Sequence, residues 1–166
     1  MKSVKSVVKI YIRNFYQPQK QITMNAIYYE VSIKFDKVTE TGLMKKVTEK
    51  YLVKAISFTD AEKQAADYIT PYVSGDYDIC AIKRTKIAEI FESANAAADR
   101  YYSAKVAYIA LDEKTGAEKR TMQLVMVKAT DFDDAREVLQ KGMEGTLGDW
   151  VKAQISETQI VDVIEA

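Results

Sequence analysis

The sequence predicts an α+β fold of two tandem β-β-α-β units, each with one helix packed on a mostly antiparallel sheet. Three observations predict it: an internal duplication, a strand-like alternation of apolar and polar residues, and a helix start signal at the same place in both copies. Residues 28–92 match residues 101–165 at a nearly constant offset, as in Tyr28-Tyr29 with Tyr101-Tyr102, Thr41-Gly42 with Thr115-Gly116, and Val53-Lys54-Ala55 with Val127-Lys128-Ala129. Because matched positions serve the same local geometry twice, the duplication indicates one architecture used twice.

The duplication divides the chain into four parts. A basic N-terminal extension covers residues 1–26, the first repeat residues 27–92, an Ala-rich linker residues 93–100 and the second repeat residues 101–166. Residues 1–23 hold five basic residues and no acidic one, so the rest of this neutral chain carries a formal charge of −5. A basic arm on an acidic body is typical of proteins that bind nucleic acid or another protein.

Each repeat is expected to begin with a β-hairpin. Apolar and polar residues alternate in the first strand, a polar stretch containing Thr-Gly follows, and a second strand completes the hairpin. Glycine at that point of the turn can supply a positive φ. The segments are, for the first and second copies respectively, strand 29–35 and 104–108, turn 36–42 and 112–116, and strand 45–56 and 119–130.

A helix and a further extended segment complete each repeat. Thr59 and Glu62 are expected to form a capping box, with Asp133 at the matching cap position and Phe58 and Phe132 as hydrophobic staples just before the caps. Glycines after residues 74 and 144 end the helices. The extended segments, residues 77–91 and 150–164, lose their apolar parity near residues 84–86 and 157–159, which indicates a bulge or two short strands in each.

Basic strand residues and paired tyrosines suggest contact with single-stranded nucleic acid. Lysines and arginines would hold phosphates and one tyrosine of each pair would stack a base, whereas the alternatives are a solvated face, a guarded sheet edge and core tyrosines. The extension interleaves its charges with aromatic residues in the same manner. The candidate residues are Lys46, Lys50, Lys54, Lys83, Arg84, Lys86, Tyr28 and Tyr101 in the repeats, and Lys5, Lys9 and Arg13 in the extension.

One face of the second repeat is apolar where its counterpart is polar. Met122, Leu124 and Met126 share a strand face whose equivalents in the first repeat are mostly polar. An apolar outer face on a one-helix sheet needs a cover. The other repeat, the N-terminal arm or a second subunit is expected to supply it.

The residue inventory argues against an enzyme. The chain has no His and one Cys, which removes the commonest general base and makes a zinc site within one chain very improbable on composition. Cys80 sits in an apolar strand and is expected to be a buried, inert thiol. The cluster Asp131, Asp133 and Asp134 suits helix capping better than Mg²⁺ binding, and no glycine-rich phosphate loop is present. No catalytic residue, metal or cofactor is therefore predicted, and the absence of a membrane-length apolar run and of a signal peptide predicts a cytoplasmic protein.

Five segments of the chain after Met24 form a recognisable set: Tyr28-Tyr29-Glu30-Val31, Lys46-Val47-Thr48-Glu49, Tyr51-Leu52-Val53, Ser57-Phe58-Thr59-Asp60-Ala61-Glu62 and Glu89-Ile90-Phe91. In these segments most of the chain after Met24 resembles an uncharacterised small-protein family of Bacteroidetes and their phages, including crAss-like phages. Members of that family begin near the Tyr-Tyr-Glu strand, so residues 1–23 are either an extension or an upstream start before Met24. A further pattern runs Val53-x-Ala55-x-x-Phe58-x-x-Ala61-Glu62, then Ser74-Gly75 and the basic strand Ile82-Lys83-Arg84. It resembles, more loosely, archaeal and eukaryotic ribosomal proteins of the LX and L18a type, which also use β-β-α-β units; such fold-level similarity carries no function.

These observations predict a non-enzymatic binding protein. The first expectation is sequence-tolerant binding of single-stranded nucleic acid in phage or host DNA metabolism. The alternative is a protein-interaction or assembly module, or homo-oligomer, that uses the Met122–Met126 face.

Overall fold

The computed structural model describes residues 25–166, and it confirms the predicted α+β class with two similar units. The first repeat contains β1 (Ile27–Val38), β2 (Met44–Ala55), helix α2 (Phe58–Ile69) with the short 3-10 helix η1 (Thr70–Tyr72), β3 (Tyr77–Arg84) and β4 (Ile87–Glu92). The second contains β5 (Arg100–Leu111), β6 (Glu118–Ala129), α3 (Phe132–Gly142), β7 (Asp149–Glu157) and β8 (Ile160–Glu165). Each predicted third segment is thus two short strands.

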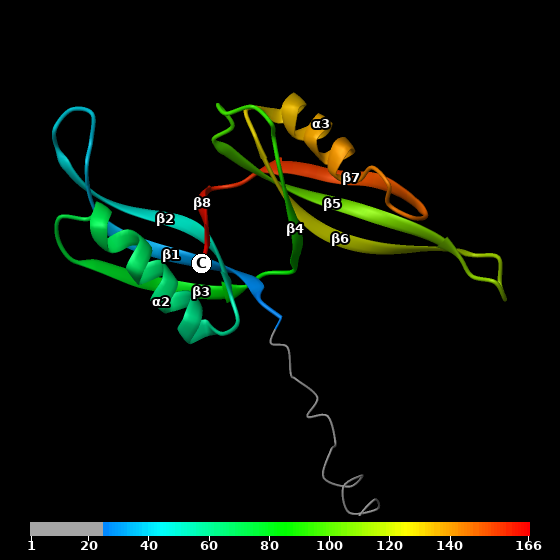
Figure 1. Ribbon diagram of the computed structural model, residues 1–166, viewed down its shortest axis with the longest axis horizontal. Coiled ribbons are helices and arrows are strands. Elements are labelled where there is room, and N and C mark those ends of the chain that lie inside the picture. The colour runs from blue at the N-terminus through cyan, green and yellow to red at the C-terminus, as the bar shows by residue number, and fades with distance from the viewer. Residues whose placement is uncertain (1–24) are drawn as a thin grey trace, which may run out of the picture.

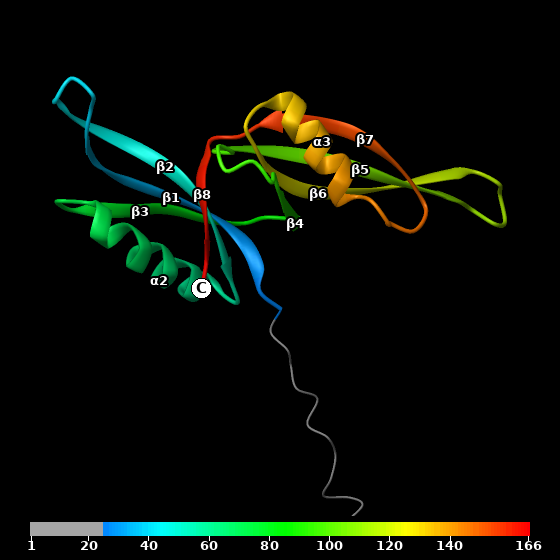
Figure 2. The same cartoon turned by 45° about the horizontal axis from the view of Figure 1, so that its top comes forward.

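The repeats exchange their last strands. The first sheet has the strand order β3-β1-β2-β8 and the second has the order β4-β6-β5-β7, so each sheet holds one strand from the other repeat (Figure 1). The exchanged strands pair parallel, β8 with β2 and β4 with β6, whereas all other pairings are antiparallel. Figure 2 shows each helix lying on one face of its own sheet, with β4 and β8 passing between the two halves.

Equivalent hydrogen bonds hold the chain at the two points where it passes from one sheet to the other, between β3 and β4 and between β7 and β8. The backbone N–H and the hydroxyl of Thr85 both donate to the carbonyl of Tyr28, at 3.0 and 2.8 Å, and the N–H of Ile87 donates to the Thr85 hydroxyl. Thr158 makes the equivalent bonds to the carbonyl of Tyr101, at 2.9 and 2.8 Å. The threonine satisfies the backbone groups that the break between strands would leave unpaired, which explains why the apolar parity slips at residues 84–86 and 157–159.

Three apolar cores follow from this arrangement. Each helix packs on one face of its sheet, through Ala61, Ala65 and Ile69 in the first repeat and Ala135, Val138 and Leu139 in the second. The third core lies between the repeats and joins residues that are related by the duplication: Tyr28 with Tyr101, Leu52 with Met126, and Ile87 with Ile160. Burial of this third core ties the two halves together.

The helix caps lie two residues earlier than predicted. Ser57, not Thr59, caps α2 by accepting from the N–H of Asp60, and Asp131, not Asp133, caps α3 by accepting from the N–H of Asp134. The carboxylates of Asp60 and Asp134 return the contact by accepting from the N–H groups of residues 56 and 130. The predicted Thr59–Glu62 capping box is therefore wrong, and the aspartates that take its place bond the N–H of the residue before each cap.

Two further expectations are corrected. Phe58 and Phe132 are the first residues of their helices rather than staples before the cap, and their rings contact Tyr29 and Tyr102 at centroid distances of 5.0 and 6.4 Å. Cys80 is exposed rather than buried. The pairing of β1 with β3 skips one residue at Cys80, and such a bulge on an edge strand turns the extra side chain outward.

The exchanged strands pack against the helices with complementary volumes. A Cβ atom at Gly142 of α3 would lie 2.5 Å from Cγ of Phe91, so the ring on β4 requires glycine at this position. The duplication places Tyr68 where α3 has Gly142 and Ile164 where β4 has Phe91. The second sheet and its helix thus combine a large strand residue with glycine, and the first sheet and its helix combine a smaller strand residue with a large helix residue.

Replacing Gly142 by Ala should lower the free energy of unfolding by about 1–3 kcal/mol, because the added methyl group displaces the Phe91 ring. Gly75→Ala is the matched control, since a Cβ atom there meets nothing within 4 Å, and it should change stability by less than about 0.5 kcal/mol. Urea unfolding measures both, and adding Phe91→Leu to Gly142→Ala should recover part of the loss. Equal effects of the two glycine substitutions would contradict this packing.

Candidate functional site

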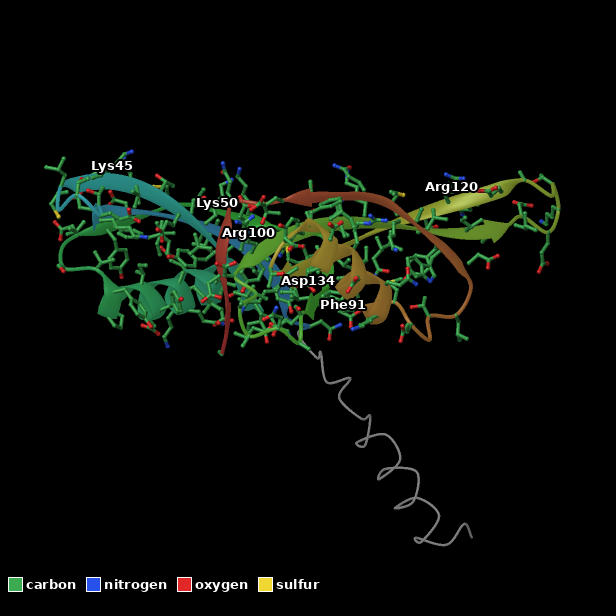
Figure 3. All side chains as sticks on the ribbon, turned by 90° about the horizontal axis from the view of Figure 1, so that it is seen from above. Lys45, Lys50, Phe91, Arg100, Arg120 and Asp134 are labelled. Carbon is green, nitrogen blue, oxygen red and sulfur yellow. The ribbon has the colours of Figure 1, made fainter. Side chains whose placement is uncertain are left out.

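Four of the predicted basic residues share the outer face of the first sheet, and the others that the structure describes lie elsewhere. Lys46, Lys50 and Lys54 share the outer face of β2, which is the face away from the helix, and Lys83 lies on β3 at the far side of β1. Lys50 is visible on that face in Figure 3. Arg84 points to the helix side, 5.3 Å from the Phe58 ring centroid, and Lys86 lies between β3 and β4. Lys5, Lys9 and Arg13 lie outside the described residues.

Two of these lysines are already paired with carboxylates. Lys50 lies 3.4 Å from Glu30, and Lys54 lies 3.7 Å from Glu165. Since residues 24–166 carry a net negative charge and these cations have local counter-ions, the body of the protein offers little uncompensated positive charge to a phosphate backbone.

Tyr28 and Tyr101 are buried in the core between the repeats, at 8% and 2% exposure. Their hydroxyls donate to Glu165 at 2.8 Å and to Asp162 at 3.0 Å. Lys54 and Lys128 lie 5.6 Å from the centroids of the two rings, one over each. Both rings therefore belong to the core, the alternative that the strand pattern left open, and this burial does not favour the base-stacking role predicted for them.

A central cleft opens where the two repeats meet. Its volume is about 830 Å³, and its lining consists largely of residues related by the duplication: Tyr28 and Tyr101, Lys54 and Lys128, Ile87, Ile90 and Val163, and the acids Glu89, Glu92, Asp162 and Glu165. The Tyr101 hydroxyl donates to Asp162 and the Tyr28 hydroxyl donates to Glu165, and Asp162 also accepts from Tyr68 at 2.9 Å. These polar groups in the lining of the cleft are therefore bonded to one another, and the hydrogen bonds help to join the two repeats.

Folding favours the neutral, protonated form of the three tyrosines that bond Glu165 and Asp162. Burial, and then the hydrogen bond to Glu165, raises the pKa of Tyr28 to about 12. Burial and the hydrogen bond to Asp162 raise the pKa of Tyr68 to about 12 and also raise the pKa of Tyr101. Deprotonation of these phenols must therefore oppose folding.

The predicted cover of the Met122–Met126 face is confirmed in part. Met126 is buried, with only 3% of its surface exposed, and Leu124 is partly buried. Both pack in the core against residues of the first repeat. The other repeat is thus the cover. Met122, however, is 53% exposed, beyond the end of that core.

An apolar strip continues from Met122 over the outer face of the second sheet. It consists of Ala107 and Ile109 on β5, Met122 on β6 and Val151 on β7, and register pairs Ala107 with both Met122 and Val151. Met122 and Val151, which are 53% and 39% exposed, flank Ala107, which is only 2% exposed. The duplication places the polar residues Lys34, Asp36, Thr48 and Asp78 at the equivalent positions of the first sheet, where Lys34 pairs with both Thr48 and Asp78.

The aspartates at the start of α3 have structural roles. Asp131 caps the helix, Asp134 accepts from Thr130 and Ser93, and Asp133 lies 3.9 Å from Arg136. Figure 3 shows Asp134 on α3, with Phe91 of β4 close by. Between residues 25 and 166 no group of three acidic, Cys or His side chains is arranged to hold a metal ion.

Sequence reasoning missed a second pocket, which lies in the first repeat alone. The tyrosine pocket, as we name it, has a volume of about 560 Å³ and lies between the β1–β2 hairpin and the C-terminal end of α2. Phe35, Tyr51, Tyr68 and Tyr72 line it together with Glu49 and Lys37. The signal that could have found it is a departure from the repeat, since the second copy has Val125, Gly142 and Thr146 in place of the three tyrosines.

Stability should fall as the pH rises from about 10, the ordinary tyrosine pKa, towards about 12. A folded-state pKa above the unfolded value contributes stability that is complete below about pH 10 and is lost as the phenol deprotonates in the folded protein. Urea unfolding across this range, compared between variants, measures the effect. Tyr28→Phe should lose less stability with rising pH than Tyr72→Phe, whose tyrosine is 73% exposed. Identical pH profiles for the two variants would contradict the role of Tyr28.

Within the described part of the chain, no helix is long and apolar enough to cross a membrane. Comparison with curated proteins and with solved structures finds no match. One family model does match, over residues 27–166, and its description is a domain of unknown function, DUF4494. The matched segment spans both repeats and both exchanged strands, and the chain therefore belongs to the DUF4494 family.

Proposed function

We propose that this protein is a non-enzymatic assembly module that pairs with a second copy of itself through the apolar strip. The observation that carries the proposal is the apolar surface on the outer face of the second sheet, where Met122 and Val151 are exposed and Ile109 is half-buried. Exposed apolar patches that polar residues surround are typical of protein–protein contact sites.

The first repeat serves as an internal comparison. It builds the same strands in the same register with Lys34, Asp36, Thr48 and Asp78 on the equivalent surface, so the fold does not require apolar residues there. Apolar residues at positions where folding does not require them favour a binding role, because exposed Met and Val side chains contribute favourable free energy only when a partner removes them from water.

Charges at the edge of the strip suit pairing of identical surfaces. Lys105 and Arg120 contribute positive charge, and Glu118 and Asp149 contribute negative charge, all on or beside the same sheet face. Arg120 already bonds Glu118 within the chain at 2.9 Å. A two-fold contact requires a self-complementary surface, and a rim with both signs of charge meets that requirement better than a rim with one sign.

Binding of single-stranded nucleic acid is the alternative that the sequence suggested, with a setting in Bacteroidetes or their crAss-like phages and in the cytoplasm. It is less well supported by the geometry: four candidate lysines share one sheet face, but two of them are ion-paired, and the two candidate tyrosines are buried. Salt-dependent binding of a labelled oligonucleotide, weakened by joint replacement of Lys46, Lys83 and Lys86 with Ala, would favour this alternative.

The self-association is tested by light scattering coupled to size exclusion. We expect wild-type protein to reach twice the mass of one chain at micromolar concentration, and the variant Met122→Thr with Val151→Asp, which installs the first repeat's residues, to be monomeric. Leu147→Thr is the control, because Leu147 is 94% exposed outside the strip, and it should leave the mass unchanged. A wild-type protein that stays monomeric at several hundred micromolar would overturn the proposal.

A further inference from the structure

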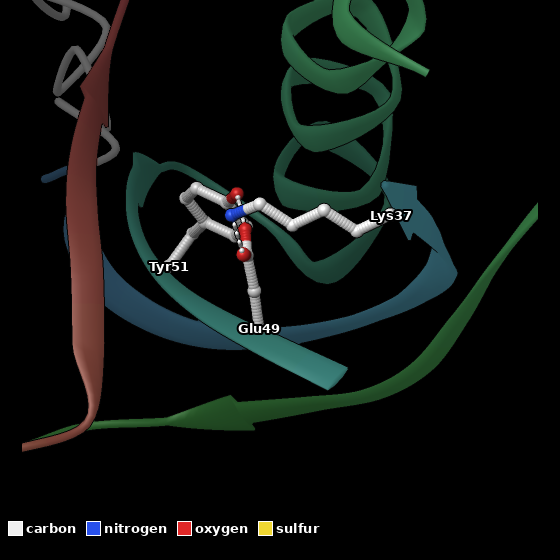
Figure 4. Close-up of polar contacts among 3 residues, drawn as sticks. All are labelled: Lys37, Glu49 and Tyr51. Atoms are coloured by element: carbon white, nitrogen blue, oxygen red, sulfur yellow. Dashed lines mark hydrogen bonds and ion pairs between the residues drawn. The ribbon is translucent and has the colours of Figure 1, made fainter. Parts of the chain in front are cut away.

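The tyrosine pocket holds an unusual combination of aromatic rings and one sheltered carboxylate. Tyr51, Tyr68 and Tyr72 form a row with centroid distances of 5.5 Å between neighbours. Glu49 lies beside this row with a side chain that is only 16% exposed, and its second oxygen accepts from the Tyr51 hydroxyl at 2.6 Å (Figure 4). Burial and this hydrogen bond raise the pKa of Tyr51, so the phenol stays neutral and keeps donating to the carboxylate.

A sheltered carboxylate needs a cation, and the one present is weakly held. Lys37 donates to Glu49 at 2.9 Å, as Figure 4 shows, but the lysine side chain is 57% exposed. An ion pair with one exposed, flexible partner gains little free energy, because the attraction is screened and the side chain loses rotamer freedom. A cation from solution that also contacted the rings would therefore displace the Lys37 ammonium from Glu49.

The charge balance of the pocket selects the same kind of ligand. Asp76 lines the pocket in addition to Glu49, so the lining holds two carboxylates and one lysine. An anionic ligand is disfavoured by this surplus. The rings of Phe35 and the three tyrosines offer negatively polarised faces, which attract a cation but provide no partner for a strongly hydrated one.

The second repeat again shows that the fold does not require these residues. At the positions of Tyr51, Tyr68 and Tyr72 it has Val125, Gly142 and Thr146, and at those of Glu49 and Lys37 it has Gln123 and Ala110. The three tyrosines, the carboxylate and the lysine thus occur together in one copy and are absent together from the other, in the same strands and helix.

We propose that the tyrosine pocket is a binding site for an alkylated ammonium group, with Glu49 as its counter-ion, the tyrosine rings around its alkyl groups and Lys37 as the internal competitor that it displaces. Methylated ammonium groups are weakly hydrated and combine positive charge with apolar surface, so they match both the carboxylate and the rings. This site lies in the first repeat, apart from the apolar strip, and stands independently of the proposed self-association.

Titration of the whole chain with choline, followed by calorimetry or by proton NMR of the aromatic region, tests the site. We expect saturable binding of choline, and binding weaker by about tenfold or more for 3,3-dimethylbutanol, which has the same shape without the charge. Glu49→Gln should weaken choline binding by a similar factor. Tyr72→Ala should weaken it several-fold without loss of fold, because Tyr72 is 73% exposed. Circular dichroism accompanies each variant.

The sharpest variant is Lys37→Met, which should bind choline several-fold more tightly because the competing ammonium is gone. Lys34→Met is the matched control: it removes an exposed lysine from the same strand but on the outer face, and it should leave choline affinity unchanged. Absence of saturable binding to both the wild type and Lys37→Met would overturn the proposal. Equal affinity for choline and its neutral counterpart would also overturn it, since the pocket would then recognise apolar shape alone.

Discussion

The parallel pairing of β8 with β2 and of β4 with β6 is the contact on which the rest of the structure depends. Without it, each hairpin would lose the strand that completes its sheet, and an isolated small sheet with one helix buries little surface. The exchange also creates the central core, in which Tyr28, Leu52 and Ile87 meet their duplicates. The two repeats therefore share both sheets and a core, and we expect them to fold as one unit.

The duplication supplies the scaffold, and the departures from it supply the chemistry. Both proposed sites occur in one repeat only: the apolar strip where the first repeat has Lys34 and Asp78, and the tyrosine pocket where the second has Val125 and Gly142. A duplicated chain is free to diverge in this way, because each copy retains the residues of the shared cores while its exposed or lining positions change. Gly142 and Phe91 show how such divergence is accommodated, since a large residue on the exchanged strand is matched by loss of the side chain on the helix.

Local features were predictable from sequence, and long-range partners were not. The hairpins, the helices and the breaks near Thr85 and Thr158 follow from alternation, capping residues and loss of apolar parity, all of which act over a few residues. The sheet that β4 or β8 joins has no local signal, because a parallel partner far along the chain imposes no pattern on the strand itself. The same limit explains the tyrosines. Alternation shows that one of Tyr28 and Tyr29 faces the helix, but only the exchange shows that the other is buried as well.

Separate expression of residues 25–92 and 100–166 tests the interlocked fold most directly. The account predicts that neither fragment folds as a monomer, and that mixing them in equal amounts restores β-sheet circular dichroism in a complex with one copy of each. A fragment that gains structure alone should do so only by pairing with another chain, since it lacks the strand that completes its sheet. Cooperative unfolding of either fragment as a monomer, shown by light scattering and urea titration, would contradict the account.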